Sequence, residues 1–217
     1  MTPYFETELG KLYHGDCIEI MPQLEQVDLV LTDIPFNVDL KYLSYQDNLP
    51  PEEYKKICSD WFGKFREVSN FYIVKAPTKT MPIVLPVFAD TLGYVWAVIQ
   101  YSPNATTHGP FNLSLYSQYL VGGTPYKRPN FDVFKNTYNK KWTEHPAEMP
   151  TAPINQLLAW FTNDGDSVCD PFLGSGTTAV ACERLNRKWI GIEISEEYCE
   201  ISAKRIEKEN KQLKLFR

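Results

Sequence analysis

The sequence predicts an α/β protein with a doubly wound, largely parallel sheet and helices on both faces. Two observations carry this prediction. Strand-like apolar runs alternate with helix-like segments along most of the chain, which favours parallel strands joined by helices. Near the carboxyl end, the apolar run around Val168 leads into Asp170, two closely spaced glycines and a helix-forming segment. A chain of 217 residues can bury a substantial core, and we expect one domain over residues 1–217.

The strands are expected where apolar or β-branched runs end in turn residues. They fall at residues 11–14, 27–32, 71–74, 94–100, 113–121 and 188–192. Pro35 follows the second of these, and it disfavours helix for the residue before it, so Asp33 is left at the carboxyl end of a strand. Open α/β sheets bind their ligands at this end of their strands.

The helices are expected between these strands, at residues 17–24, 51–68, 81–92 and 154–161, with another after Ser195. Pro51 suits a first helical position, and Ser195 suits the position that caps a helix. Ile154, Leu157 and Phe161 lie on one apolar stripe of helical period. Residues 122–150 fit no regular pattern.

The glycine-rich stretch at 170–178 has the form of a ligand-binding turn. Gly174 and Gly176 lack Cβ, so the backbone can take unusual φ values and a ligand can come close. N–H groups at the start of the following helix would face a polar or anionic group. Glu193 ends the next strand, 19 residues after Gly174, where an acid can hold the hydroxyls of a ribose. The pattern therefore predicts a cofactor that carries a nucleoside.

Three cofactor classes suit such a turn. A phosphate-binding P-loop needs a lysine where Thr177 stands, and it is excluded. A dinucleotide remains open because residues 174–179 satisfy the GxGxxG/A pattern, and S-adenosylmethionine is the third class.

The turn resembles a motif of one family. Residues 170–178 are similar to the cofactor-binding motif of amino-directed DNA methyltransferases, which methylate adenine N6 or cytosine N4. Asp33-Ile34-Pro35-Phe36 resembles the catalytic motif of the same family, usually Asp/Asn/Ser-Pro-Pro-Tyr/Phe. The order, with the catalytic motif first, resembles the circularly permuted β class. The resemblance implies a Rossmann-like fold, S-adenosylmethionine as cofactor and DNA as partner.

The resemblance also assigns roles to individual residues. The catalytic residues it implies are Asp33, Ile34, Pro35 and Phe36, and the cofactor-binding residues are Asp16, Cys17, Asp33, His145, Asp170, Phe172, Gly174, Ser175, Gly176, Thr177, Thr178 and Glu193. Two positions depart from the family pattern: Ile34 replaces a proline, and Met149 stands where many relatives have lysine. The first departure favours a substrate amine outside DNA, and the second removes a charged contact.

The chemistry that these residues suit is methyl transfer to an exocyclic amine. Such an amine is a poor nucleophile because its lone pair is delocalised into the base. The Asp33 carboxylate and the Ile34 carbonyl could accept its two N–H groups and turn the lone pair toward a methyl group. Phe36 could stack on an extruded base. We expect adenine N6 as the target before cytosine N4. An RNA or protein amine is the alternative substrate, and an NAD-dependent oxidoreductase is a remote alternative function.

Residues 122–144 combine basic and aromatic side chains. Five basic and two acidic residues give this segment a net charge of +3, in a chain whose total is −5. The basic residues are Lys127, Arg128, Lys135, Lys140 and Lys141. Interleaved cations and aromatic rings suit phosphates and unstacked bases, so we expect a target-recognition segment here.

Composition adds expectations about the setting. There is no basic-then-apolar leader and no apolar run of membrane-spanning length, so we expect a soluble, cytoplasmic chain without membrane contact. The five cysteines have no metal-ligand spacing, and we expect reduced, inert thiols and no metal. A homodimer and a companion restriction enzyme are further partners compatible with the resemblance.

Overall fold

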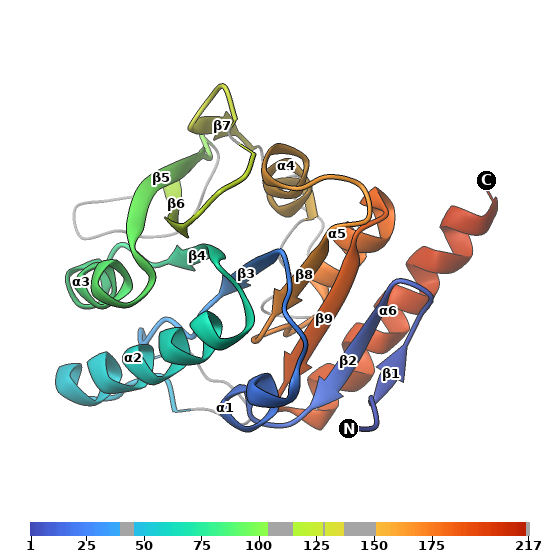
Figure 1. Ribbon diagram of the computed structural model, residues 1–217, viewed down its shortest axis with the longest axis horizontal. Coiled ribbons are helices and arrows are strands. Elements are labelled where there is room, and N and C mark those ends of the chain that lie inside the picture. The colour runs from blue at the N-terminus through green and yellow to red at the C-terminus, as the bar shows by residue number, and fades with distance from the viewer. Residues whose placement is uncertain (40–45, 104–114, 128, 137–150, 216–217) are drawn as a thin grey trace.

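The computed structural model describes residues 1–39, 46–103, 115–127, 129–136 and 151–215. Within these described residues a nine-stranded sheet forms, with three helices on each face (Figure 1). The strand order is β1-β2-β9-β8-β3-β4-β6-β5-β7.

The strands are β1 (Phe5–Glu6), β2 (Gly10–His14), β3 (Leu29–Asp33), β4 (Phe71–Ala76), β5 (Tyr94–Tyr101), β6 (Tyr116–Gly123), β7 (Val133–Lys135), β8 (Ser167–Asp170) and β9 (Lys188–Glu193). The helices are α1 (Cys17–Ile20), α2 (Pro51–Val68), α3 (Met81–Leu92), α4 (Thr151–Phe161), α5 (Thr177–Leu185) and α6 (Glu196–Leu215), with one 3₁₀ turn, η1 (Met21–Gln23).

The centre of the sheet is parallel, as predicted. β2, β9, β8, β3 and β4 pair in parallel, whereas β1 and β6 run antiparallel to their neighbours. Leu29, Val30 and Leu31 of β3 are all buried, the continuous apolar run expected of a strand covered on both faces.

The helices divide between two cores. One core packs α1, α2 and α3 against the sheet, and the other packs α4, α5 and α6 against its opposite face (Figure 1). In α2, buried residues such as Tyr54, Cys58, Trp61 and Phe65 recur at helical spacing, and Glu52 lies in the first turn, where the helix dipole favours an acid. α2 and α3 occupy the predicted residues.

The prediction was wrong within residues 122–150, where no regular structure was expected. β6 extends to Gly123, and the three-residue strand β7 pairs in parallel with Ile99–Tyr101 of β5. So short a run has no periodicity of its own, and only the long-range pairing makes it a strand. Residues 113–114 of the expected strand, and residues 137–150, lie outside the described part of the chain.

The order in which strands are added to the sheet reverses between β3 and β8. From β3 the chain passes through α2 to β4 on one side, and from β8 through α5 to β9 on the other. Leu29 and Val30 of β3 pair with Val168 and Cys169 of β8, so two segments far apart in sequence end side by side. Parallel sheets form their ligand crevice outside the carboxyl ends of the strands at such a switch point.

All five cysteines are buried and unpaired. Burial raises the pKa of each thiol above its usual value, to about 12 for Cys58 and Cys199. Burial and a raised thiol pKa lower the reactivity of a cysteine, in keeping with the inert thiols that the sequence predicts. No helix in the described residues is long and apolar enough to cross a membrane.

Candidate active site

A cavity of about 290 Å³ lies at the switch point between β3 and β8. The two sequence motifs meet there, because the Thr32 hydroxyl at the end of β3 donates to Asp170 Oδ1 at the end of β8 over 2.6 Å. Two residues that are 138 positions apart in the chain thus join the motifs into one site.

Nearly all the predicted site residues that the structure describes line this cavity. They are Asp16, Cys17, Asp33, Ile34, Pro35, Phe36, Asp170, Phe172, Gly174, Ser175, Thr177, Thr178 and Glu193. Gly176 does not line it. His145, Arg128, Lys140, Lys141 and Met149 lie outside the described residues.

Glu193 and the glycine turn are joined directly. The Gly174 N–H donates to one carboxylate oxygen of Glu193 and the Ser195 N–H to the other, each over 2.8 Å. Burial raises the pKa of Glu193, and the backbone N–H donors oppose this shift. Gly174 has φ +54°, and a Cβ at this residue would meet no atom closer than 3.9 Å. Gly174 therefore leaves open space beside the cavity, as a residue that admits a ligand must.

Gly176 lies away from the cavity lining and packs against α6. A Cβ there would lie 2.9 Å from Ser202 Cβ, so the missing side chain lets α6 pack against the turn. Gly176 has φ +82° and precedes α5, and Arg205 of α6 donates to Ser175 and Thr177 on either side of it. The sequence could not separate the two glycines because α6 begins 20 residues later.

Replacing Gly176 by alanine should therefore cost stability rather than act on a ligand directly. We expect Gly176→Ala to lower the free energy of unfolding by about 1–3 kcal/mol, the usual cost of an overpacked side chain. Gly165→Ala is the matched control, because Gly165 has φ +83° and a Cβ there would meet nothing within 4 Å. Urea denaturation of both variants measures the difference, and equal losses would mean that backbone strain alone explains Gly176.

Asp170 is held at the bottom of the turn. It accepts hydrogen bonds from the Thr32 hydroxyl, the Thr178 hydroxyl and the Phe172 N–H. Burial raises its pKa to about 6 against the effect of these donors, and the neighbouring Asp33 adds to the rise. Asp170 therefore fixes the ends of β3, β8 and α5 relative to one another.

The turn after β3 is held by hydrogen bonds to its carbonyls. The Tyr54 hydroxyl donates to the Pro35 carbonyl over 2.7 Å, and the Thr80 hydroxyl to the Phe36 carbonyl over 3.2 Å. No described side chain donates to the Ile34 carbonyl. Asn37 then returns the chain to Leu49 by two hydrogen bonds, of 2.6 and 2.9 Å. The turn is thus fixed on the carboxyl side of Ile34, whose carbonyl accepts from none of these side chains.

One carboxylate oxygen of Asp33 accepts a hydrogen bond from a described residue, and the other does not. Lys75 of β4 donates to Oδ2 over 2.7 Å, whereas Oδ1 is buried and has no partner among the described residues. Burial raises the pKa of Asp33 above its ordinary value, and Lys75 acts in the opposite direction. A buried acceptor left unsatisfied is costly, which is typical of a group that awaits a ligand.

Several cavity residues were not found from the sequence. Trp61 packs edge-on against Phe172, with ring centroids 4.9 Å apart, and Tyr119, Tyr198 and Lys75 complete the walls. Each lies in a helix or strand whose apolar pattern predicts burial but not which face meets the cavity. Lys75 has no signal in the sequence, and only the β3–β4 register of the structure, which pairs Asp33 with Lys75, reveals it.

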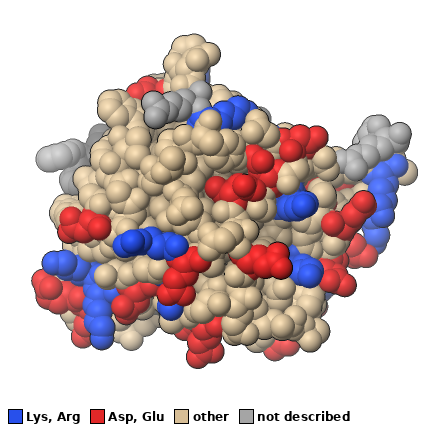
Figure 2. Space-filling view, viewed as in Figure 1, with Lys and Arg blue, Asp and Glu red and all other residues tan. Residues whose placement is uncertain are grey.

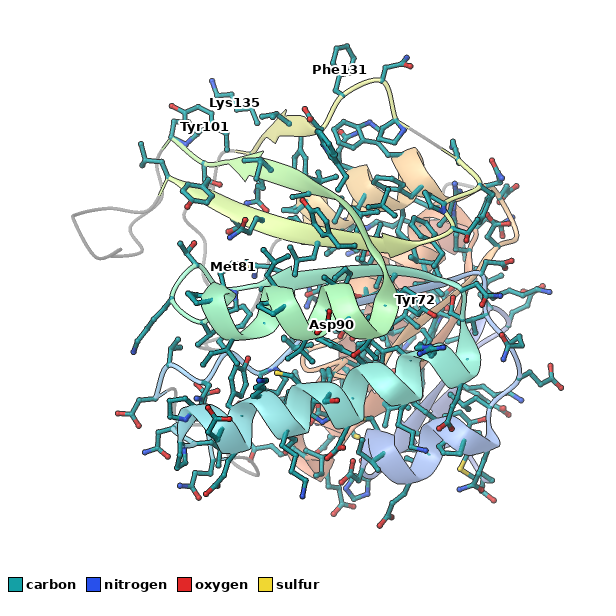
Figure 3. The ribbon with its side chains drawn as sticks, turned by 60° about the vertical axis from the view of Figure 1, so that its left-hand side comes forward. Tyr72, Met81, Asp90, Tyr101, Phe131 and Lys135 are labelled. Atoms are coloured by element: carbon teal, nitrogen blue, oxygen red, sulfur yellow. The ribbon has the colours of Figure 1, made fainter. Side chains whose placement is uncertain are left out.

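Of the five predicted nucleic-acid contacts, the structure describes Lys127 and Lys135. The Lys127 ammonium donates to the Ala159 and Thr162 carbonyls, at 2.8 and 3.0 Å, at the carboxyl end of α4. Lys135 is exposed at the end of β7, opposite Tyr101 in the register, and Figure 3 shows it with Phe131 at the outer edge of the sheet. Neither arrangement tests the predicted contacts.

The residues present suit a nucleoside cofactor with a positively charged centre. The turn offers backbone close to the cavity at Gly174, and Glu193 offers lone pairs beyond its two backbone bonds. Asp16 accepts from the Ile18 N–H over 2.8 Å through one oxygen, and its side chain is exposed. Aromatic rings and four carboxylates line the same space, which suits an adenosine joined to a cation.

A strand-end carboxylate beside a glycine turn, on this sheet, fits the Rossmann-like methyltransferase that the sequence resembles. Comparison with known proteins agrees with that class. The family described as DNA methylase matches residues 90–204. The type II methyltransferase M2.LlaDCHI of Lactococcus lactis subsp. cremoris is 41% identical over 95% of this chain and 92% of its own length. The chain belongs to this family, the amino-directed N6/N4 DNA methylases.

Two further comparisons extend the likeness. The type II methyltransferase M.BamHI of Bacillus amyloliquefaciens is 28% identical over 99% of this chain, which spans 61% of the length of M.BamHI. A solved structure of the PvuII DNA methyltransferase, which is cytosine-N4-specific, has a TM-score of 0.77 at 20% identity, over 94% of this chain and 88% of its own. The second likeness shows the fold alone.

Family membership settles the cofactor class. The family is S-adenosylmethionine-dependent, so S-adenosylmethionine is the cofactor of this chain. The NAD-dependent alternative is set aside. The predicted catalytic motif, after β3, precedes the predicted cofactor motif, after β8, which is the order expected of the permuted arrangement.

Proposed function

We propose that the chain methylates an exocyclic amine of a DNA base, with adenine N6 as the target. The single observation that carries the proposal is the position of Asp33. Its carboxylate ends β3 at the wall of the cavity that also contains the glycine turn after β8. Aspartate opens the catalytic motif for both bases, and in the resembling family it is the commoner residue for adenine.

S-adenosylmethionine supplies an electrophilic methyl group on a sulfonium. The chain supplies position and charge. Asp33 Oδ1 and the Ile34 carbonyl accept the two N–H groups of the amine, so its lone pair turns out of the plane of the base. As positive charge develops on that nitrogen, the Asp33 carboxylate stabilises it. Phe36, two residues beyond Ile34, contacts the ring of the base.

Gly174, Glu193 and Asp16 are proposed to hold the adenosine part of the cofactor. The Glu193 carboxylate is already oriented by the Gly174 and Ser195 N–H groups, which leaves lone pairs for ribose hydroxyls. Asp170 does not need to touch the cofactor to matter, because it fixes the turn to the end of β3.

The DNA is proposed to dock on the basic and aromatic segment that includes Lys127 and Lys135. Tyr126, Phe131 and Val133 are exposed in the same segment. Elsewhere on the view of Figure 2, acidic and basic side chains are interspersed over α2 and along α6. Because the total charge of the chain is −5, contact with phosphates depends on a local basic surface such as this segment.

Removing Lys127 and Lys135, the two basic residues of this segment that the structure describes, should weaken binding of DNA. For the double variant Lys127→Ala, Lys135→Ala we expect a smaller salt dependence, by up to about 0.9 log units for each phosphate that is no longer neutralised. Lys204→Ala is the control, since Lys204 is an exposed α6 lysine paired with Glu200. Fluorescence anisotropy at several salt concentrations measures the slope, and an unchanged slope would place the docking surface elsewhere.

The substrate class is tested by offering three acceptors in parallel. Radiolabelled S-adenosylmethionine is incubated with the chain and random duplex DNA, structured RNA or a lysine-rich peptide. Label on DNA alone supports the proposal. Label on RNA or peptide alone would replace it with the second candidate, an RNA or protein amine, which Ile34 and the acidic total charge favour.

A further inference from the structure

Lys75 is unusual for its position in the sheet. It lies in β4, where the other residues are buried, and only 14% of its side chain is exposed. Enclosing an ammonium is costly unless it is paired and hydrogen-bonded. A largely buried lysine beside the cavity therefore suggests a function in the site.

The surroundings of Lys75 point to such a role. Its ammonium donates to Asp33 Oδ2 over 2.7 Å and lies 5.1 Å from the centroid of the Phe36 ring. The first and last residues of the proposed catalytic tetrapeptide are therefore both in contact with one cation. The parallel register of β3 and β4 sets this geometry, because it places Asp33 and Lys75 opposite one another.

The charges around the cavity make the pairing matter. Four carboxylates line it, and Lys75 is the only lysine or arginine among the described lining residues. Besides Lys75 and Asp33, the titratable groups among the described lining residues are Asp16, Cys17, Asp170, Tyr119, Glu193 and Tyr198. None of these carries a positive charge, so Lys75 alone on this wall favours an ionised Asp33.

We propose that Lys75 is a positioning residue for methyl transfer: it holds the Asp33 carboxylate through Oδ2 and the Phe36 ring by its charge, which leaves Oδ1 to accept from the substrate amine. This rests on the proposed function. The amine becomes positively charged as it gains the methyl group, and an ionised Asp33 both stabilises that charge and can accept the proton the nitrogen then loses. Lys75 contacts the oxygen that the amine does not use.

The pairing also has a consequence for pH. Burial raises the pKa of Asp33 and Lys75 lowers it, so removing the ammonium leaves only the upward shift. Activity that needs the ionised carboxylate is lost as pH falls through that pKa. Without Lys75 this loss begins at a higher pH, and each unit of the shift is about tenfold in rate on the acid side.

The first test is a titration that needs no substrate. Carbon-13 NMR follows the aspartate carboxyl signals of the cofactor-free protein, with Asp33→Asn used to assign the Asp33 signal. In Lys75→Met we expect Asp33 to titrate at higher pH than in the parent, and in Lys75→Arg near the parent value. Lys64→Met is the control, because Lys64 pairs with Glu67 over 2.6 Å on the exposed side of α2 and should leave Asp33 unchanged.

The second test is kcat against pH with saturating cofactor and DNA. The acid limb of Lys75→Met should move up in pH, kcat should recover toward the parent above it, and Lys75→Arg should restore most of the activity below it. The same Asp33 titration in Lys75→Met and Lys64→Met, or a loss of kcat equal at every pH, would overturn the proposal. If Lys75→Met does not fold, Lys75→Gln carries both tests with the same outcomes. The titration involves no methyl acceptor, so it decides the Asp33–Lys75 pairing even if DNA proves not to be the substrate.

Discussion

Asp33→Ala should lose about 10²- to 10³-fold in kcat while keeping its affinity for S-adenosylmethionine, as when one donor to a developing charge is removed from an active site. The carboxylate is an acceptor at the cavity wall with one oxygen unpartnered among the described residues, and the glycine turn is built by other residues. Asp33→Asn keeps an acceptor oxygen and should be less damaging. Single-turnover methyl transfer gives the rate, and titration calorimetry gives the affinity.

Asp90→Ala is the control for this substitution. Asp90 is exposed on α3, and Figure 3 shows it on the helix, away from β7 and its loop. It should keep both rate and affinity. If Asp33→Ala instead lost cofactor binding in step with activity, Asp33 would serve the cofactor or the fold. Circular dichroism separates these two cases, since the substitution also leaves Lys75 without its carboxylate partner.

Gly174→Val should weaken cofactor binding by about 100-fold. In the complex the valine side chain and the cofactor would take the same space, and such an overlap costs up to roughly 3 kcal/mol. Gly174 lines the cavity, and the direction of its absent Cβ is open, with nothing nearer than 3.9 Å. The branched side chain would fill the space that the cofactor needs. Titration calorimetry with S-adenosylhomocysteine measures the effect without turnover.

The backbone strain of this substitution needs its own control. Gly165→Val places the same side chain at φ +83°, in a turn where no atom lies within 4 Å of the Cβ. Both variants carry the cost of a left-handed valine, but Gly165 does not line the cavity. Equal cofactor affinity in Gly174→Val and Gly165→Val would contradict the assignment of the turn.

The sequence predicted the elements whose signals are local. α2 begins at Pro51 and α3 ends before Gly93, and both follow from the preferences of proline and glycine at helix ends. Asp33 and Asp170 were placed at strand ends by the apolar runs before them. Their proximity followed only from the likeness to a family, and the β3–β8 pairing now supplies its physical basis.

What the sequence missed depends on contacts between distant segments. β7 forms by pairing with β5, in the register that places Val133 opposite Ile99. Gly176 has no side chain because Ser202 of α6 packs against it. In the sequence, Lys75 is only a polar residue within an apolar strand. The structure shows that the β3–β4 register brings it into contact with Asp33. Such pairings have no fixed spacing, so no local pattern announces them.

The cavity between β3 and β8 is proposed to be the site at which the chain methylates an exocyclic base amine. The most direct measurement is to incubate the chain with S-adenosylmethionine and a pool of random-sequence duplex DNA, digest the DNA to nucleosides and identify them by mass spectrometry. We expect N6-methyladenine, produced by the parent chain and reduced to a trace in Asp33→Ala. N4-methylcytosine would correct the target base and keep the mechanism. A methyl group on a ring carbon, or equal yields from the parent and Asp33→Ala, would mean that Asp33 does not catalyse methylation of a base amine.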